Sequence, residues 1–145
     1  MMNFSSFKGK KILLVNVASE CMYTPQYEQM EALNKHSKES LVVVGVPCND
    51  FGGQEPGNEQ AIQQFCETNF KVSFPMTEKI QIKAPNTHDL YKFATTKALN
   101  GKEDNVVQWN FQKFLFDENG QLQQVFDPAD EPLGDKILQA CNIQL

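Results

Sequence analysis

The sequence predicts an α/β protein with a four-stranded mixed sheet flanked by helices, and two patterns carry this expectation. Apolar, β-branched runs at residues 11–17 and 41–46 are separated by a helical segment, which makes a βαβ unit with parallel strands. Two further runs, at residues 111–117 and 121–126, flank Asn119-Gly120, a turn pair typical of a β-hairpin. We expect the first strand to lie centrally, between the second strand and the hairpin.

Capping signals place the helices. Thr24-Pro25 predicts the start of the first helix, with Thr24 as the N-cap and Pro25 at the first helical position, and the apolar spacing continues to about Ser37. We expect three more helices, of which the first is capped by Asn58, the second by Thr87, and the last begins near Glu131 or Leu133. No repeat or linker interrupts this order, so residues 1–145 are expected to form a single domain.

Composition excludes several function classes. The chain has 145 residues, of which 41% are hydrophobic, so it can bury a core without disulfides. Its net charge is -5 and all 13 cationic side chains are lysines, which disfavours nucleic-acid binding. The longest apolar run is far too short to span a bilayer, and no segment of signal-peptide length stands at the start. We therefore expect a cytoplasmic protein without stable membrane insertion.

The cysteines and histidines do not form a metal-ligand pattern. The four cysteines lie at positions 21, 48, 66 and 141, and none are paired as CxxC. Neither histidine is spaced with a cysteine as zinc sites require, so we expect no metal. In a reducing compartment each cysteine is then either a core residue or a reactive one.

Cys21 is the candidate reactive cysteine. It follows a buried strand and precedes a helix start, where backbone N–H groups and the helix dipole favour the thiolate. The glycine-rich loop at residues 47–57 leaves the second parallel strand at the same edge of the sheet. Open α/β sheets carry functional groups at this edge, near the point where strand order reverses.

Five segments in this order resemble motifs of the glutathione peroxidase family. They are Asn16–Cys21, Thr24–Tyr27, Pro47–Gly57, Phe74–Met76 and Trp109–Leu115. The resemblance extends from about Phe7 to Asp117, with the last helix in register. It implies a thioredoxin-like fold and an antioxidant enzyme of the oxidative stress response, a thiol peroxidase that reduces hydrogen peroxide or organic hydroperoxides.

The resemblance also assigns site residues. It places the attacking residue on Cys21 and its catalytic partners on Gln54, Trp109 and Asn110. Alone, the tryptophan would be taken as core filling and the glutamine as a loop residue. Their chemistry nevertheless suits peroxide reduction, because a thiolate attacks one oxygen while the other leaves as an anion, and amide and indole N–H groups can stabilise that charge.

Cys66 has two interpretations. Its spacing from Ile62 places it on the buried face of a helix, which indicates a core cysteine. The resemblance instead makes it the resolving cysteine, which condenses with the Cys21 sulfenic acid to a disulfide. Since a disulfide needs Cα atoms about 4.4–6.8 Å apart, the second interpretation requires residues 58–70 to unwind on oxidation. Cys48 and Cys141 are expected to be structural.

The remaining expectations concern partners and alternatives. Members of the family usually carry an N-terminal β-hairpin, and with only six residues before Phe7 we expect this sequence to lack it. The absence of arginine and the presence of Cys66 favour thioredoxin over glutathione as the reductant, and no bound cofactor is expected. An interface insert of tetrameric members is missing, which favours a monomer. A redox sensor that relays its disulfide to a signalling partner, or a binding module that keeps only the fold, are the alternative functions.

Overall fold

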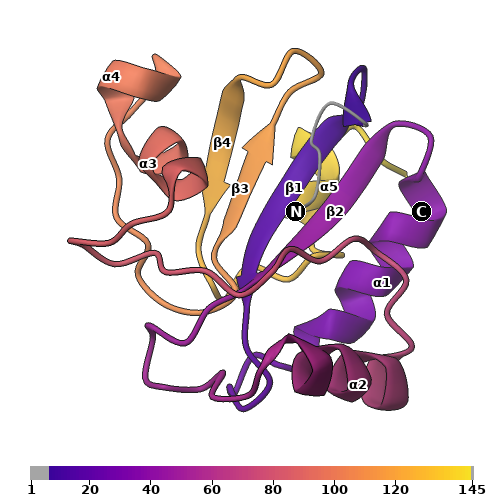
Figure 1. Cartoon of the computed structure of the whole chain (residues 1–145). Coiled ribbons are helices and arrows are strands. Elements are labelled where there is room, and N and C mark those ends of the chain that lie inside the picture. Colours follow the sequence, from indigo (N-terminus) through magenta and orange to yellow (C-terminus); the bar gives the residue numbers. More distant parts are fainter. Residues whose placement is uncertain (1–6, 145) are drawn as a thin grey trace.

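A four-stranded mixed sheet forms the centre of the protein, in the order β2-β1-β3-β4 (Figure 1). The computed structural model describes residues 7–144. The strands are β1 (Lys11–Val17), β2 (Leu41–Pro47), β3 (Lys113–Phe116) and β4 (Leu122–Phe126). β1 pairs with β2 in parallel and with β3 antiparallel, and β3 and β4 form the hairpin. The predicted central place of the first strand is therefore confirmed. The expectation about an N-terminal hairpin concerns residues 1–6, which lie outside the described residues.

Five helices surround this sheet in the described part of the chain. They are α1 (Gln26–Ser37), α2 (Glu59–Phe70), α3 (Asp89–Thr95), α4 (Lys97–Asn100) and α5 (Asp135–Ala140). α3 and α4 lie on the side of the hairpin opposite to α1 and α2 in the view of Figure 1. No helix among residues 7–144 is both long and apolar enough to cross a membrane.

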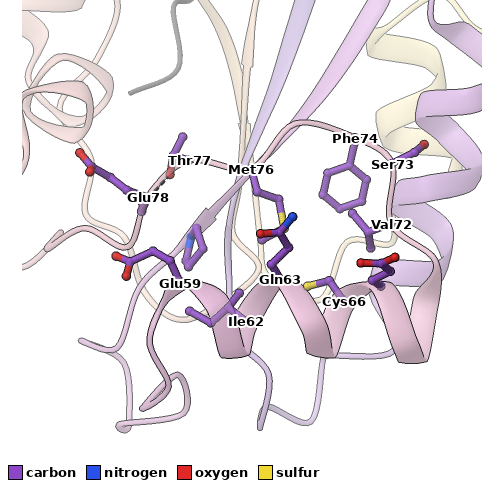
Figure 2. A pocket seen from close by; sticks show the side chains of 12 residues that line it. Glu59, Ile62, Gln63, Cys66, Val72, Ser73, Phe74, Met76, Thr77 and Glu78 are labelled. Carbon is purple, nitrogen blue, oxygen red and sulfur yellow. Dashed lines mark hydrogen bonds between the residues drawn. The ribbon is translucent and has the colours of Figure 1, made fainter.

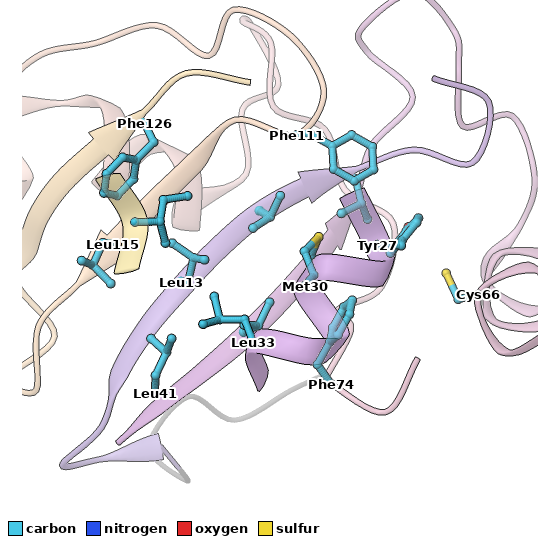
Figure 3. Packing of buried hydrophobic residues seen from close by; sticks show 14 of the residues in the cluster. Leu13, Tyr27, Met30, Leu33, Leu41, Cys66, Phe74, Phe111, Leu115 and Phe126 are labelled. Atoms are coloured by element: carbon cyan, nitrogen blue, oxygen red, sulfur yellow. The ribbon is translucent and has the colours of Figure 1, made fainter. Parts of the chain in front are cut away.

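Alternate residues of the strands build two cores, one on each face of the sheet. On one face Leu13 of β1 and Leu115 of β3 pack with Leu33 of α1 and with side chains of α2 and α5 (Figure 3). On the other face Leu14 and Phe114 pack against α3. This division follows from the two-residue period of a strand, which turns successive side chains to opposite faces.

Several predicted boundaries were wrong. α1 begins at Gln26, because the hydroxyl of Thr24 is engaged in the preceding turn and does not cap the helix. α3 is capped by His88, whose Nδ1 accepts a hydrogen bond from the Leu90 amide, in place of Thr87. The last helix begins only at Asp135. The predicted cap of α2 is confirmed, since Asn58 Oδ1 accepts the Ala61 amide at 2.9 Å.

A buried carboxylate ties the segment after α2 to α1. Glu31 Oε1 accepts the amides of Ser73 at 2.7 Å and Phe74 at 3.2 Å, and Oε2 accepts the Ser73 hydroxyl at 2.6 Å. Burial raises the pKa of Glu31, but these hydrogen bonds outweigh it and leave the pKa below its ordinary value. The segment then runs beside β2, where Met76 forms an isolated parallel bridge with Gly45.

Candidate active site

Cys21 lies in a tight turn between β1 and α1. The Cys21 amide donates to Thr24 Oγ1 at 2.9 Å, and the same hydroxyl donates to the Ala18 carbonyl at 2.9 Å. The Tyr23 amide donates to Cys21 Sγ at 3.3 Å. The thiol residue is 7% exposed. The hydrogen bond to sulfur therefore comes from the turn itself, and not from the first turn of the helix as the sequence suggested.

Asn16 joins the end of β1 to the segment that carries the Trp109-Asn110 pair. Its side-chain Nδ2 donates to the Trp109 backbone carbonyl at 3.0 Å, and its backbone carbonyl accepts the Phe111 amide at 2.6 Å. Phe111 has φ +66°, so the chain turns sharply here and enters β3 two residues later than predicted. Sequence reasoning placed Asn16 at the start of a matching motif but gave it no role, although a polar side chain in a buried strand indicates a required partner.

Asn110 orients Gln54. Asn110 is fully buried, and its Nδ2 donates both to Gln54 Oε1 at 3.0 Å and to the Phe51 carbonyl at 3.0 Å. Both hydrogens of this amide are then engaged, so Asn110 holds its neighbour in place and does not itself offer a free donor. With its oxygen fixed, Gln54 is left with its own N–H pair to donate.

Gln54 is also linked to the turn of Cys21. The backbone carbonyl of Gln54 accepts a hydrogen bond from the amide of Glu20, the residue before Cys21, at 3.0 Å. The loop of Gln54 thus meets the thiol turn, although none of the three predicted partner side chains donates a hydrogen bond to Cys21 Sγ within residues 7–144.

Trp109 packs on the glycine-rich loop. The indole is half-buried and contacts Phe51 edge-on, with ring centroids 6.3 Å apart. It lies directly over Gly52, where a Cβ atom would be only 2.6 Å from the indole Cη2. Gly52 also has φ +73°, a conformation that favours glycine. The loop therefore needs glycine at this position for the indole to take its place.

Glu55 is a site residue that sequence reasoning missed. Its buried Oε1 accepts the Ser19 amide at 3.1 Å, and its own amide donates to Asn49 Oδ1 at 2.8 Å. These bonds join the loop of Gln54 to the turn before Cys21. Burial raises the pKa of Glu55, while hydrogen bonds from Ser19 lower it. Its signal in the sequence was a lone carboxylate directly after Gln54.

Comparisons with known proteins agree with this arrangement. The model of the family described as glutathione peroxidase matches residues 1–95. This chain belongs to the glutathione peroxidase family. It is 42% identical over 130 residues to the glutathione peroxidase-like peroxiredoxin HYR1 of Saccharomyces cerevisiae, covering 89% of this chain and 80% of that protein.

Two further family relationships support the assignment. The hydroperoxy fatty acid reductase gpx1 of Synechocystis is 42% identical over 134 residues, which cover 87% of this chain and 78% of the relative. The crystal structure of Trgpx in its apo form matches with a TM-score of 0.70 and 32% identity, covering 98% of this chain and 87% of that one. The thioredoxin-like α/β fold implied by the resemblance is thereby confirmed.

Cys66 of this glutathione peroxidase family member is buried on α2. It is 2% exposed, it faces Tyr27 of α1 (Figure 3), and it is not bonded to another cysteine. Burial raises the pKa of the Cys66 thiol; the Tyr27 hydroxyl lowers it, and Glu55 raises it further. In the reduced protein Cys66 is therefore held as a thiol in the same buried cluster that contains Cys21.

A pocket of about 480 Å³ opens beside Cys66. It lies between α2 and the segment after it, with Ile62, Phe74 and Met76 on its apolar side and Glu59 at its edge (Figure 2). The pocket lies beside the cysteine that the sequence predicts to be the resolving one, although Cys66 itself is less exposed than Cys21, at 2% against 7%.

The other two cysteines lie in the cores. Burial raises the pKa of Cys48 to about 12 and that of Cys141 to about 11, so both are thiols at neutral pH. Among the described residues, no group of three or more His, Cys, Asp and Glu side chains could hold a metal ion.

Proposed function

We propose that this protein reduces hydrogen peroxide or organic hydroperoxides through Cys21. As a member of its family the chain is an oxidoreductase of the thiol peroxidase class. The observation that carries the assignment to these residues is the hydrogen bond from Asn110 to Gln54, which fixes a neutral donor beside the turn of Cys21. The names of two relatives, a peroxiredoxin and a hydroperoxy fatty acid reductase, support a hydroperoxide as the substrate.

The first step is attack of the Cys21 thiolate on one peroxide oxygen. The O–O bond breaks, Cys21 becomes a sulfenic acid, and the other oxygen leaves and takes up a proton to form water or an alcohol. The Tyr23 amide stabilises the thiolate through its hydrogen bond to sulfur. The free N–H pair of Gln54 and the indole N–H of Trp109 supply neutral donors for the negative charge on the leaving oxygen.

The second step is attack of Cys66 on the Cys21 sulfenic acid. An S–S bond forms, the S–O bond breaks, and the hydroxyl leaves as water with the proton of the Cys66 thiol. Thioredoxin then reduces the disulfide and returns both thiols. A relative named as a peroxiredoxin, the absence of arginine and the pocket beside Cys66 favour this reductant over glutathione.

We expect α2 to open when the disulfide forms, and the small number of buried residues in this helix supports this. Of its 12 residues only Ile62 and Cys66 are buried, so little apolar surface holds the helix against α1. The helix also ends at Lys71 in the left-handed conformation, with φ +51°. We propose that residues 58–70 unwind on oxidation, and that the enzyme works as a cytoplasmic monomer in oxidative-stress defence without a bound cofactor.

The proposed function is tested by peroxide-dependent NADPH oxidation, with thioredoxin and its reductase or with glutathione and its reductase. We expect turnover with thioredoxin, no turnover for Cys21→Ser, and for Cys66→Ser a single oxidation without turnover. Cys141→Ser is the matched control, because Cys141 is buried in the same cluster as Cys66, and it should turn over normally.

Two outcomes would overturn parts of this scheme. Peroxide consumption at the wild-type rate by Cys21→Ser would exclude Cys21 as the attacking residue. Turnover with glutathione that is unaffected by Cys66→Ser would exclude the resolving role. Hydrogen exchange of the oxidised protein should show loss of protection in residues 58–70, and unchanged protection there would contradict the opening of α2.

A further inference from the structure

Lys113 is a fully buried lysine at the centre of the molecule, with 0% of its surface exposed. It lies on β3, where it pairs with Val15 of β1 and Phe126 of β4. Lysine is almost never fully buried unless its amine is paired. Neither peroxide attack nor disulfide formation, as described above, uses this residue, so its position calls for another explanation.

The amine of Lys113 clamps two parts of the chain together. Nζ donates to Gln26 Oε1 at 2.5 Å and to the Pro128 carbonyl at 2.8 Å, and Gln26 Nε2 donates to the same carbonyl at 3.0 Å. Both acceptors of the amine are neutral. The start of α1, β3 and the turn after β4 therefore meet at one buried amine.

A continuous path of contacts leads from this clamp to Cys21. Gln26 is the first residue of α1, and its amide donates to the Tyr23 carbonyl at 2.8 Å. The Tyr23 amide in turn donates to Cys21 Sγ at 3.3 Å. Whatever fixes the side chain of Gln26 thus fixes the turn that supplies an N–H group to the thiol.

The Lys113 amine gains or loses its proton close to neutral pH. Burial lowers its pKa to about 7, while the carboxylates of Asp130 and Glu131, in the turn after β4, raise it. Asp130 is also ion-paired with Lys136 of α5 at 3.4 Å, whereas α1 presents the neutral amide of Gln26 to the amine. A charged amine makes hydrogen bonds about twice as strong as a neutral one, so the clamp weakens as the amine loses its proton.

We propose that Lys113 is a positioning residue for Cys21, whose protonated amine holds Gln26 and thereby keeps the Tyr23 amide on the reactive sulfur. This role rests on the proposed function, since it concerns the reactivity of the attacking cysteine. It makes the reactivity of Cys21 depend on an amine that lies outside the set of Gln54, Trp109 and Asn110.

The test is the rate of alkylation of Cys21 by iodoacetamide in the folded protein, followed by mass spectrometry from pH 5.5 to 9. Lys113→Met keeps an unbranched, flexible side chain as far as the ε position and removes the amine. We expect this substitution to lower the alkylation rate about tenfold below pH 7, because loss of one hydrogen bond to the sulfur would have an effect of that size. At pH 9 the rate should fall by less. Lys11→Met is the matched control, because Lys11 also donates to a glutamine oxygen, that of Gln123 at 2.7 Å, but at the other end of β1. This control should stay within about twofold of the wild type at every pH, well under the tenfold change.

A second variant tests whether the charge on Lys113 sets the pH dependence of the alkylation rate. Asp130→Asn removes a charge that favours the protonated amine, so the pH at which the wild-type and Lys113→Met rates converge should move down when both carry this change. A ratio of the two rates that is constant with pH, or equal to one throughout, would overturn the proposal. If Lys113→Met does not fold, Lys113→Arg, which keeps its charge, should lack the component of the profile near pH 7, and retention of that component would contradict us. Because alkylation needs no peroxide, failure here is distinct from failure of the proposed function.

Discussion

Gly52→Ala should displace the indole of Trp109, and it thereby tests the role that we propose for this indole in peroxide reduction. At φ +73° an alanine costs about 1–2 kcal/mol of backbone strain. Its Cβ would also lie 2.6 Å from the indole Cη2 and 3.1 Å from Cζ2, so the ring must move. Such overpacking costs about 1–3 kcal/mol more. We therefore expect a loss of about 2–5 kcal/mol in the free energy of unfolding.

Gly53→Ala is the control for this prediction. Gly53 has a similar φ of +62°, but nothing lies within 4 Å of an added Cβ, so only the strain of about 1–2 kcal/mol applies. Urea unfolding can follow both variants through the emission of Trp109, the single tryptophan. Gly52→Ala should also shift the native emission and slow oxidation of Cys21 by peroxide. Equal stability and equal emission of the two variants would refute the close contact between Gly52 and the indole.

Three further predictions concern buried polar groups. Asn110→Ala leaves the Phe51 carbonyl and Gln54 Oε1 without a donor, so urea unfolding should show a loss of about 2–4 kcal/mol, and single-turnover kinetics a slower oxidation of Cys21. Glu31→Gln should cost about 1.5–3 kcal/mol at pH 7. Because the folded-state pKa of Glu31 is lowered, that penalty should shrink as the pH falls through it, and a penalty equal at pH 7 and pH 3 would contradict the prediction. The pKa of Glu55 is raised on folding, so its contribution to stability is present below the unfolded pKa and lost as the pH rises through the folded one. Glu55→Gln should therefore flatten the stability profile of the wild type in that range, and an unchanged profile would argue against it.

The strands and their order were predictable, but the single helix expected after Thr87 is divided in the structure into α3 and α4. The apolar runs predicted all four strands and the central place of β1, because the two-residue period is a local property of each run. The starts of α1, α3 and α5 were not predictable in the same way. Thr24 has the side chain of an N-cap, yet its hydroxyl is taken by the turn of Cys21, and no local rule reveals such competition.

Motifs in the sequence named the members of the candidate site, but not how their side chains are arranged. The motifs pointed to Gln54, Trp109 and Asn110 together, and both amides were expected to offer donors. In the structure the donors of Asn110 are consumed by Gln54 and Phe51, which makes it a support. Asn16, Glu55 and Lys113 lie within the matching motifs but received no role, because the partners of a polar side chain are known only in the folded chain.

The sequence by itself determined the strands, the family and the candidate reactive cysteine, because each is written in patterns only a few residues long. The tertiary structure alone decided which polar groups serve that cysteine. Asn110 meets Gln54 across 56 positions of the chain, and Lys113 meets Gln26 across 87. Hydrogen bonds act only within about 3 Å, so the role of such a side chain is set by whichever distant segment folding brings to that distance.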